Sequence, residues 1–225
     1  MEKLRRWLDN YWYHYKWHTL ICAFCFVVLI IAISSFITKE EYDVYAVYAG
    51  AHAFVEDEQK NLIDDIAGFC SDDYSGNGEI QTSLLSFVYV SPERAKEYLE
   101  NDIFYSAPLN YETRKSIVSQ LNSGDAYIYL MDESLFCELV EIGYFLPLKD
   151  VLGQRPENAY NDYGILLGDT ALGKNCESAS VLPEDTVLCI KRNNAIMSTL
   201  GTAKNEENLA HHKAVFARLA GVSEG

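Results

Sequence analysis

Basic residues are scarce in this chain of 225 residues, which has 18 Lys and Arg against 33 Asp and Glu. The deficit lies beyond residue 38, because residues 39–225 hold 14 basic and 31 acidic side chains and so carry a net charge of −17. A surface this negative repels phosphate backbones and anionic lipid. We therefore exclude nucleic acid as a main partner and interpret the acidity as a contribution to solubility.

Catalytic motifs are also lacking. The sequence contains no Gly-x-Ser-x-Gly elbow, no glycine loop that would hold a phosphate, and no zinc-binding helix of the His-Glu-x-x-His type. It has no internal repeats or low-complexity tracts, so most of the chain is expected to fold. We expect no catalytic residues, no cofactor and no bound metal, and so do not expect an enzyme.

One long apolar run lies near the N-terminus. Between Lys16 and Lys39 there are 22 residues without a formal charge. As a helix they would extend roughly 33 Å, which matches a hydrocarbon core of about 30 Å. The run predicts a transmembrane helix over residues 17–38. Since basic residues precede it and acidic residues follow it, we expect a cytoplasmic tail over residues 1–16 and an extracellular domain over residues 39–225, in a single-pass protein of the cell membrane.

Two other interpretations of this run fit less well. A cleaved signal peptide has an apolar region of only about 7–15 residues and a small-residue cleavage site, which Ala32-Ile33-Ser34 matches poorly. A lipoprotein signal places a cysteine near the end of the run, whereas Cys22 and Cys25 lie near its beginning. The aromatic residues before the run suit an inner-interface belt.

Beyond residue 42 the pattern alternates between strands and helices. Apolar or Val- and Tyr-rich segments predict strands at residues 43–50, 83–90, 126–131, 163–167 and 186–191. Amphipathic stretches predict helices at residues 56–70 and 134–142, one at residues 111–121 capped by Asn110, one that begins at Ser91-Pro92, and a last one capped by Asn205. This alternation predicts an α/β fold with a mostly parallel sheet and helices on both faces.

A short series of positions within residues 121–152 has a recognisable order: a Gly-Asp start, an apolar strand that ends in Asp, a helix, and a Gly-aromatic-Leu-Pro-Leu-x-Asp turn. The matching residues are Gly124, Asp125, Asp132, Gly143, Phe145, Leu146, Pro147, Leu148 and Asp150. The segment resembles the third strand and following helix of bacterial extracellular solute-binding proteins, the type II periplasmic-binding-protein-like family. The resemblance implies one lobe of that fold over residues 43–152. Only 75 residues follow Asp150, too few for a second lobe, which implies a single-lobe or truncated relative.

Candidate ligand-binding residues follow the predicted strands. In an open α/β sheet, ligands lie beyond the carboxyl ends of the strands. His52, Ser91, Asp132 and Glu133 occupy these positions and could line one polar crevice. The alternative is that they are turn and capping groups, with Ser91 and Asp132 at helix N-termini.

Other polar clusters give weaker signals. Asp73, Ser75 and Asn77 have the spacing of a calcium loop, but Leu84 stands where the last ligand should be, so a flexible turn is the better interpretation. His211 and His212 are adjacent and would point about 100° apart on a helix, so they are not expected to chelate a metal together.

Four cysteines follow residue 42, at positions 70, 137, 176 and 189. A bridge between Cys176 and Cys189 would stabilise their loop by roughly 3 kcal/mol, and free buried thiols are the alternative.

Two functional hypotheses result. The first is a membrane-anchored, extracytoplasmic solute-binding-like module of a bacterial cell surface, which binds a small solute or a partner. The second is a scaffold for an envelope assembly, in which the domain binds another protein and no small ligand. An exposed apolar patch on the domain would favour the second hypothesis.

Overall fold

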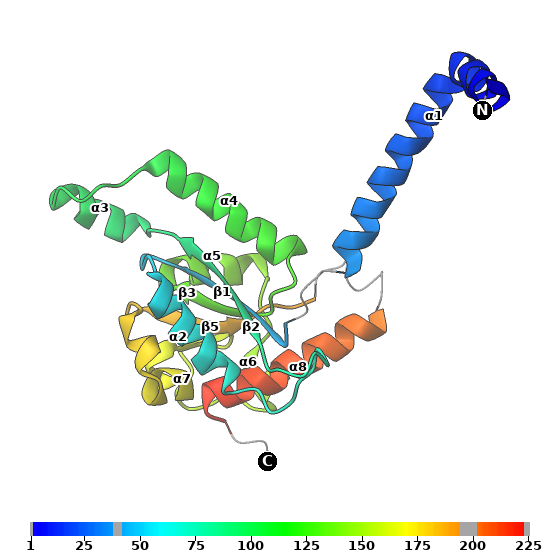
Figure 1. The fold of residues 1–225 in the computed structure, drawn as a ribbon. Coiled ribbons are helices and arrows are strands. Elements are labelled where there is room, and N and C mark those ends of the chain that lie inside the picture. The colour runs from blue at the N-terminus through cyan, green and yellow to red at the C-terminus, as the bar shows by residue number, and fades with distance from the viewer. Residues whose placement is uncertain (1, 38–41, 194–201, 223–225) are drawn as a thin grey trace. The chain divides into compact units, whose positions relative to one another are not determined.

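The computed structural model describes residues 2–37, 42–193 and 202–222, and the chain divides into two compact units, Met1–Glu41 and Tyr42–Gly225. The first unit is the helix α1 (Glu2–Ile37). The second unit contains the sheet and the remaining helices (Figure 1).

The membrane anchor is the first prediction that the structure corrects. In the part of the chain that the structure describes, no helix combines the length and the apolarity that crossing a hydrocarbon core requires. The predicted single-pass anchor and the cell-membrane localisation, with an inner N-terminus and an extracellular domain, are therefore wrong.

The described part of residues 42–225 forms a five-stranded sheet in the order β2-β1-β3-β5-β4. The strands are β1 (Val44–Gly50), β2 (Thr82–Val88), β3 (Ile128–Asp132), β4 (Gly164–Leu166) and β5 (Thr186–Ile190). β1 pairs in parallel with β2 and β3, whereas β5 pairs antiparallel with both β3 and β4. The α/β class is confirmed, but the sheet is mixed and the prediction of a mostly parallel sheet is wrong.

Helices join these strands in chain order. They are α2 (Glu56–Ala67), α3 (Pro92–Glu100), α4 (Ala107–Ser123), α5 (Glu133–Ile142), α6 (Leu148–Leu152), α7 (Ala171–Asn175) and α8 (Thr202–Ala220), with short 3-10 turns at Leu167–Asp169 and Glu177–Val181. The strands β1 and β2 are joined through α2, and β2 and β3 through α3 and α4.

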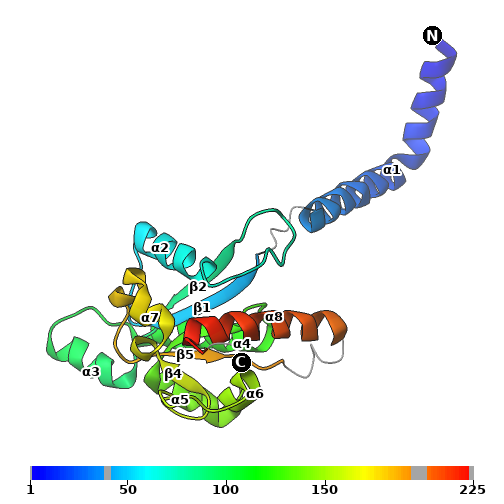
Figure 2. The ribbon, with the colours of Figure 1, turned by 90° about the horizontal axis from the view of Figure 1, so that it is seen from below.

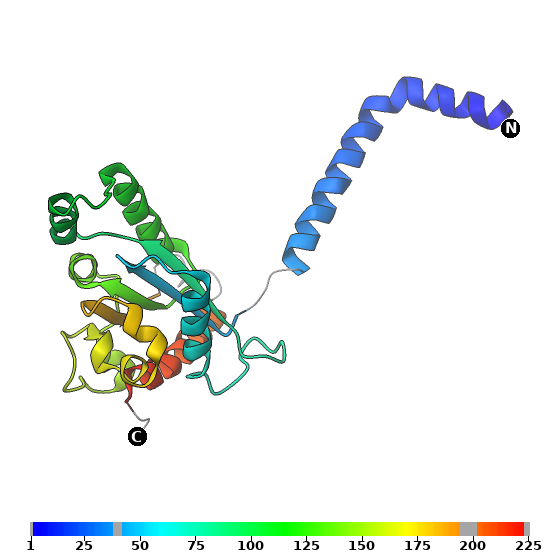
Figure 3. The same cartoon turned by 60° about the vertical axis from the view of Figure 1, so that its left-hand side comes forward.

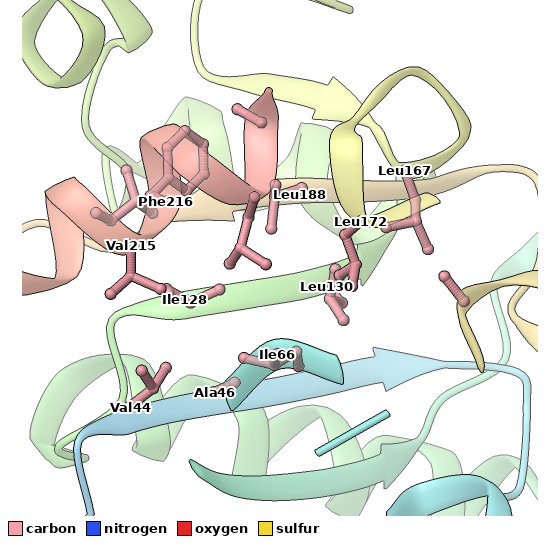
Figure 4. Close-up of a cluster of buried hydrophobic side chains, with 14 of the residues drawn as sticks. Val44, Ala46, Ile66, Ile128, Leu130, Leu167, Leu172, Leu188, Val215 and Phe216 are labelled. Carbon is pink, nitrogen blue, oxygen red and sulfur yellow. The ribbon is translucent and has the colours of Figure 1, made fainter. Parts of the chain in front are cut away.

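Each face of the sheet has its own hydrophobic core. On one face, α2 and α8 pack over the sheet with Ile66 and Phe216 among the buried side chains (Figures 2 and 4). On the other face, α4 and α5 bury Ile117 and Phe136 against the sheet (Figure 3). The two parallel crossovers, α2 and α3–α4, therefore cover opposite faces, which makes the space between β1 and β3 the topological switch point of the sheet.

Helix boundaries match the prediction where capping groups act locally. Ser91 caps α3 and is followed by Pro92 in the first turn, and Gly143 ends α5 in the left-handed conformation with φ 91°. The prediction fails at α4, which begins at Ala107, and at α8, which begins at Thr202, so Asn110 and Asn205 lie inside their helices.

Candidate functional site

The four candidate residues follow β1, β2 and β3, and two of them act as helix caps. One carboxylate oxygen of Asp132, Oδ1, accepts hydrogen bonds from the main-chain N–H of Ser134 at 3.0 Å and of Leu135 at 3.3 Å. The Ser91 hydroxyl accepts from the main-chain N–H of Arg94 at 3.4 Å. Asp132 and Ser91 are both buried, so the capping alternative describes them correctly.

Arg94 joins these caps into one charged cluster. One guanidinium nitrogen donates to both carboxylate oxygens of Asp185, at 2.6 and 2.7 Å. Its Nε lies 3.8 Å from the second oxygen of Asp132, beyond hydrogen-bonding distance. Among the described residues, this buried Nε has no hydrogen-bond partner.

Burial sets the charge balance of the cluster. The hydrogen bond to Asp185 raises the pKa of Arg94, so the guanidinium stays charged. Desolvation raises the pKa of Asp132, against the lowering effect of its cap hydrogen bonds and of Arg94. One cation then lies between two carboxylates, of Asp132 and Asp185.

Tyr48 lies beneath the same cluster at the centre of β1. Its hydroxyl accepts a hydrogen bond from the main-chain N–H of His52 at 3.0 Å, which fixes the turn after β1. Burial raises the pKa of Tyr48 to about 12. This tyrosine therefore stays protonated at neutral pH and acts as a support for the turn.

The other two candidate residues, His52 and Glu133, contact separate partners. His52 Nε2 lies 2.9 Å from a carboxylate oxygen of Glu58, and its ring packs edge-on against Phe54. Glu133 accepts from the Tyr160 hydroxyl at 2.5 Å, and this hydrogen bond raises the pKa of Tyr160. The structure thus brings Ser91 and Asp132 together around Arg94 and gives His52 and Glu133 other contacts.

A hollow of about 350 Å³ lies beside this edge, between the end of β2 and the α3–α4 segment. Apolar side chains dominate its lining, among them Phe87, Val88, Phe104 and Leu109. Asn110 sits at its base, where its side-chain amide pairs with both the N–H and the C=O of Val90, each at 2.9 Å. Asn110 therefore takes the place of a neighbouring strand for this one residue.

Exposed apolar side chains, three of which line this hollow, lie on β2, α3, the link to α4, and α4. They are Leu85, Val88, Leu99, Ile103, Phe104, Leu109 and Tyr111, and we call them the β2–α4 apolar surface. Phe104 is the most exposed of the seven, at 85%. Val88, Phe104 and Leu109 line the hollow together, and exposed apolar side chains grouped in this way mark an interaction site more often than single ones do.

The suspected calcium loop is a hydrogen-bonded turn. The Asp73 carboxylate accepts from the main-chain N–H of Gly76 and Gly78, both at 2.7 Å, and from that of Asn77 at 3.2 Å. These hydrogen bonds lower the pKa of Asp73. Among the described residues, no group of His, Cys, Asp and Glu has the arrangement of a metal site, and the turn interpretation accounts for the loop.

The two adjacent histidines have a structural role in holding α8. His212 is buried, and its Nδ1 lies 2.7 Å from the Asn208 carbonyl while Nε2 accepts from the Tyr45 main-chain N–H at 3.3 Å. His211 lies 3.0 Å from the Asp43 carbonyl and stacks on Tyr74. Both histidines therefore fasten α8 to the start of β1.

The cysteines are free thiols throughout the described chain. Cys189 is buried near the end of β5, and Cys176 is partly buried just after α7. The bridge between these two cysteines is therefore absent, and the free-thiol alternative holds.

Comparisons with known proteins gave no relative. No protein-family model, no curated protein and no solved structure matches this chain. The geometry of the chain itself is the basis for the proposals below.

Proposed function

We propose that this protein is an interaction module that binds another protein through the β2–α4 apolar surface. The carrying observation is the group of exposed apolar side chains at one hollow, since Val88, Phe104 and Leu109 line it and are 46%, 85% and 64% exposed.

The outward edge of β2 provides main-chain hydrogen-bonding groups beside this surface. Because Gln81 O accepts from Asp43 N, and Tyr89 N donates to Gly50 O, the odd-numbered residues of β2 direct their main-chain polar groups toward β1. The even-numbered residues therefore direct theirs outward. An edge strand with free outward groups is a template for pairing with another chain.

A photoreactive residue tests this proposal. Benzoylphenylalanine at position 109 of the full-length chain lies on the surface, and at position 142 it provides a matched control on α5, since Leu109 and Ile142 are 64% and 59% exposed. We expect protein adducts from position 109 and few from position 142. Equal labelling from the two positions would contradict the proposal.

A second candidate function is small-ligand binding at the carboxyl edge, in a domain related to one lobe of the periplasmic-binding-protein-like fold. The Gly124–Asp150 resemblance supports it, as does the buried Arg94 Nε beside the Asp132 carboxylate. Thermal unfolding against sugars, peptides, amino acids and divalent metals tests it, because a ligand at about 100 times its dissociation constant adds roughly 2.7 kcal/mol. No shift with any compound would remove these ligand classes.

A further inference from the structure

Two side-chain amides limit the open part of the outward edge of β2. At one end, the Gln59 amide donates to the Leu84 carbonyl at 3.0 Å. At the other end, the Asn110 amide holds the N–H and the C=O of Val90, each at 2.9 Å. A strand added to this edge can therefore pair only with the short stretch between the two amides.

The main-chain groups within this stretch are open and lie beside the hollow. Ser86 and Val88 direct their N–H and C=O groups outward, and in the described part of the chain nothing hydrogen-bonds to them. Both residues are exposed and both line the hollow. The strand also lacks the lysine, proline or bulge that usually keeps an edge unpaired. An extended segment can therefore approach the edge from the side of the hollow.

The length of the open stretch favours an antiparallel segment. In antiparallel pairing, the residues opposite Val88 and Ser86 each exchange both main-chain hydrogen bonds with them. Three consecutive residues of the segment then satisfy all four open groups and stop short of both amides. A parallel segment needs a longer stretch to reach the same groups, because parallel hydrogen bonds slant along the strands.

This register directs one side chain of the segment into the hollow. The middle residue of the three lies opposite Phe87, and side chains of opposite residues point to the same face of a sheet. Phe87 packs on the α4 face and itself lines the hollow. The hollow measures about 350 Å³, within the range of about 300–1,000 Å³ that ligand pockets span, and Phe104 and Leu109 give it an apolar wall. A large apolar side chain fits there.

Charge around the hollow selects the neighbours of that side chain. Residues 81–92 contain no charged side chain, whereas residues 97–111, which supply most of the opposite wall, contain three acidic side chains and no basic one. The three are Glu97, Glu100 and Asp102, and all are exposed. The whole of residues 39–225 carries −17. A basic segment is attracted to this rim, while an acidic segment or a second copy of the domain is repelled.

We propose that an extended basic segment of another protein adds antiparallel to β2 and places one large apolar side chain in the hollow. The main-chain groups of Ser86 and Val88 hold the segment in register. The carboxylates of Glu97, Glu100 and Asp102 attract basic residues on either side of the apolar one. The inference rests on the proposed function, since it names the chemistry of the protein that the β2–α4 apolar surface binds.

A fluorescent probe peptide, Lys-Lys-Thr-Phe-Thr-Lys-Lys, tests this inference by its anisotropy with the full-length chain. Methylation of both threonine main-chain nitrogens removes the N–H groups that donate to the carbonyls of Ser86 and Val88, and should weaken binding about tenfold. Methylation of the phenylalanine nitrogen is the matched control, because that N–H points away from β2 in this register and binding should not change. Replacement of phenylalanine by alanine, or of the lysines by glutamate, should weaken binding at least tenfold.

A variant of the chain tests the hollow with the same peptide. Leu109→Ala shortens one side chain of the wall and should weaken binding of the peptide several-fold. Ile142→Ala is the matched control on α5, since the two positions are 64% and 59% exposed, and binding should equal that of the unchanged chain. Both substitutions lie at exposed positions, so neither should affect folding.

Four results would each overturn the strand addition. They are no binding of the unmodified peptide up to about 1 mM, equal binding of the peptides methylated at threonine and at phenylalanine, equal binding of the lysine and glutamate forms, and no loss with Leu109→Ala. The photoreactive residue at position 109 separates this failure from that of the proposed function. If it labels proteins more than position 142 does while the peptides fail, the proposed function stands. If the peptides fail and the two positions label equally, both proposals fail.

Discussion

Two opposing effects act on the ionisation of the buried Asp132, at the carboxyl edge of the sheet. Its cap hydrogen bonds and Arg94 favour the ionised carboxylate, while burial favours the neutral acid, and burial is the larger effect because the pKa is raised. A raised pKa in the folded state means that the folded protein binds this proton more tightly than the unfolded chain does. The negative charge on Asp132 therefore lowers the free energy of unfolding at pH values above its pKa. The cap hydrogen bonds offset part of this loss.

Substitution at Asp132 separates the cap from the charge. Asp132→Ala removes the cap and should lower the free energy of unfolding by about 1 kcal/mol, whereas Asp132→Asn keeps an oxygen acceptor and should be close to neutral at pH 7. As pH falls through the pKa of Asp132, the stability of the unchanged protein should rise relative to Asp132→Asn. Urea unfolding over a series of pH values measures both effects, and equal losses for the two variants would show that capping is unimportant here.

Arg94 and Asp185 are the strongest charged pair of the cluster. A double-mutant cycle with Arg94→Ala and Asp185→Ala should give a coupling energy of about 1 kcal/mol, at the upper end for a pair that is about one-third exposed. The coupling should weaken in high salt. An exposed pair on α4, Glu112 and Lys115, is the control, and a coupling no larger than the control's would contradict the structural role of Arg94.

This cluster was beyond the reach of local sequence patterns. Arg94 and Asp185 are 91 residues apart, and no periodicity in either segment relates one to the other. Ser91 and Asp132 were found because a cap is a local signal, a polar residue immediately before a helix. The sequence therefore identified half of the cluster and could not identify its central cation.

At the scale of elements, α8 depends on a neutral histidine. Burial lowers the pKa of His212 to about 4, and burial also lowers the pKa of His211. Since the unfolded value is about 6.5, the unfolded chain binds these protons first. The stabilising effect of the neutral rings is complete above pH 6.5 and is lost as pH falls toward 4.

Acid should therefore loosen α8. Between pH 6.5 and pH 4 the domain should lose up to about 3 kcal/mol through His212, and His212→Gln should flatten this part of the pH profile. His52→Gln is the control, because His52 lies in a partly exposed pair with Glu58. Thermal unfolding across this range checks the prediction, and a profile that His212→Gln leaves unchanged would contradict it.

The two edges of β2, one paired with β1 and one open, give another prediction. Ser83→Pro removes an N–H that faces β1 and should lower the free energy of unfolding by about 3 kcal/mol, whereas Ser86→Pro removes one that faces outward and should have little effect on stability. Circular dichroism during thermal unfolding distinguishes them. Equal destabilisation by the two substitutions would mean that the outward direction of Ser86 is wrong.

Strand positions were predictable because apolar runs and Gly or Pro boundaries are local. The direction of β5 was not predictable, since the apolar pattern of its segment is the same in either orientation. The Gly124–Asp150 resemblance also depends on local features of turns and packing. Gly124 ends α4 and its carbonyl accepts from the buried Lys191, so two of these shared positions, Gly124 and Gly143, serve turns and packing.

At the scale of the whole molecule, an acidic domain keeps a group of apolar side chains exposed. The acidic residues keep most of the domain solvated, while the β2–α4 apolar surface and the free edge of β2 remain uncovered. Sequence reasoning predicted that such a patch would favour protein binding, but it could not locate the patch, because β2 becomes an edge only through the strand order. The predicted membrane span failed at this scale as well.

Amide hydrogen exchange of the full-length chain tests the central claim, the open outward edge of β2, most directly. In dilute protein, the amides of Ser86 and Val88 should exchange rapidly, while that of Phe87, which faces β1, should be protected. Exchange at Val88 that is as slow as at Phe87 would contradict the account.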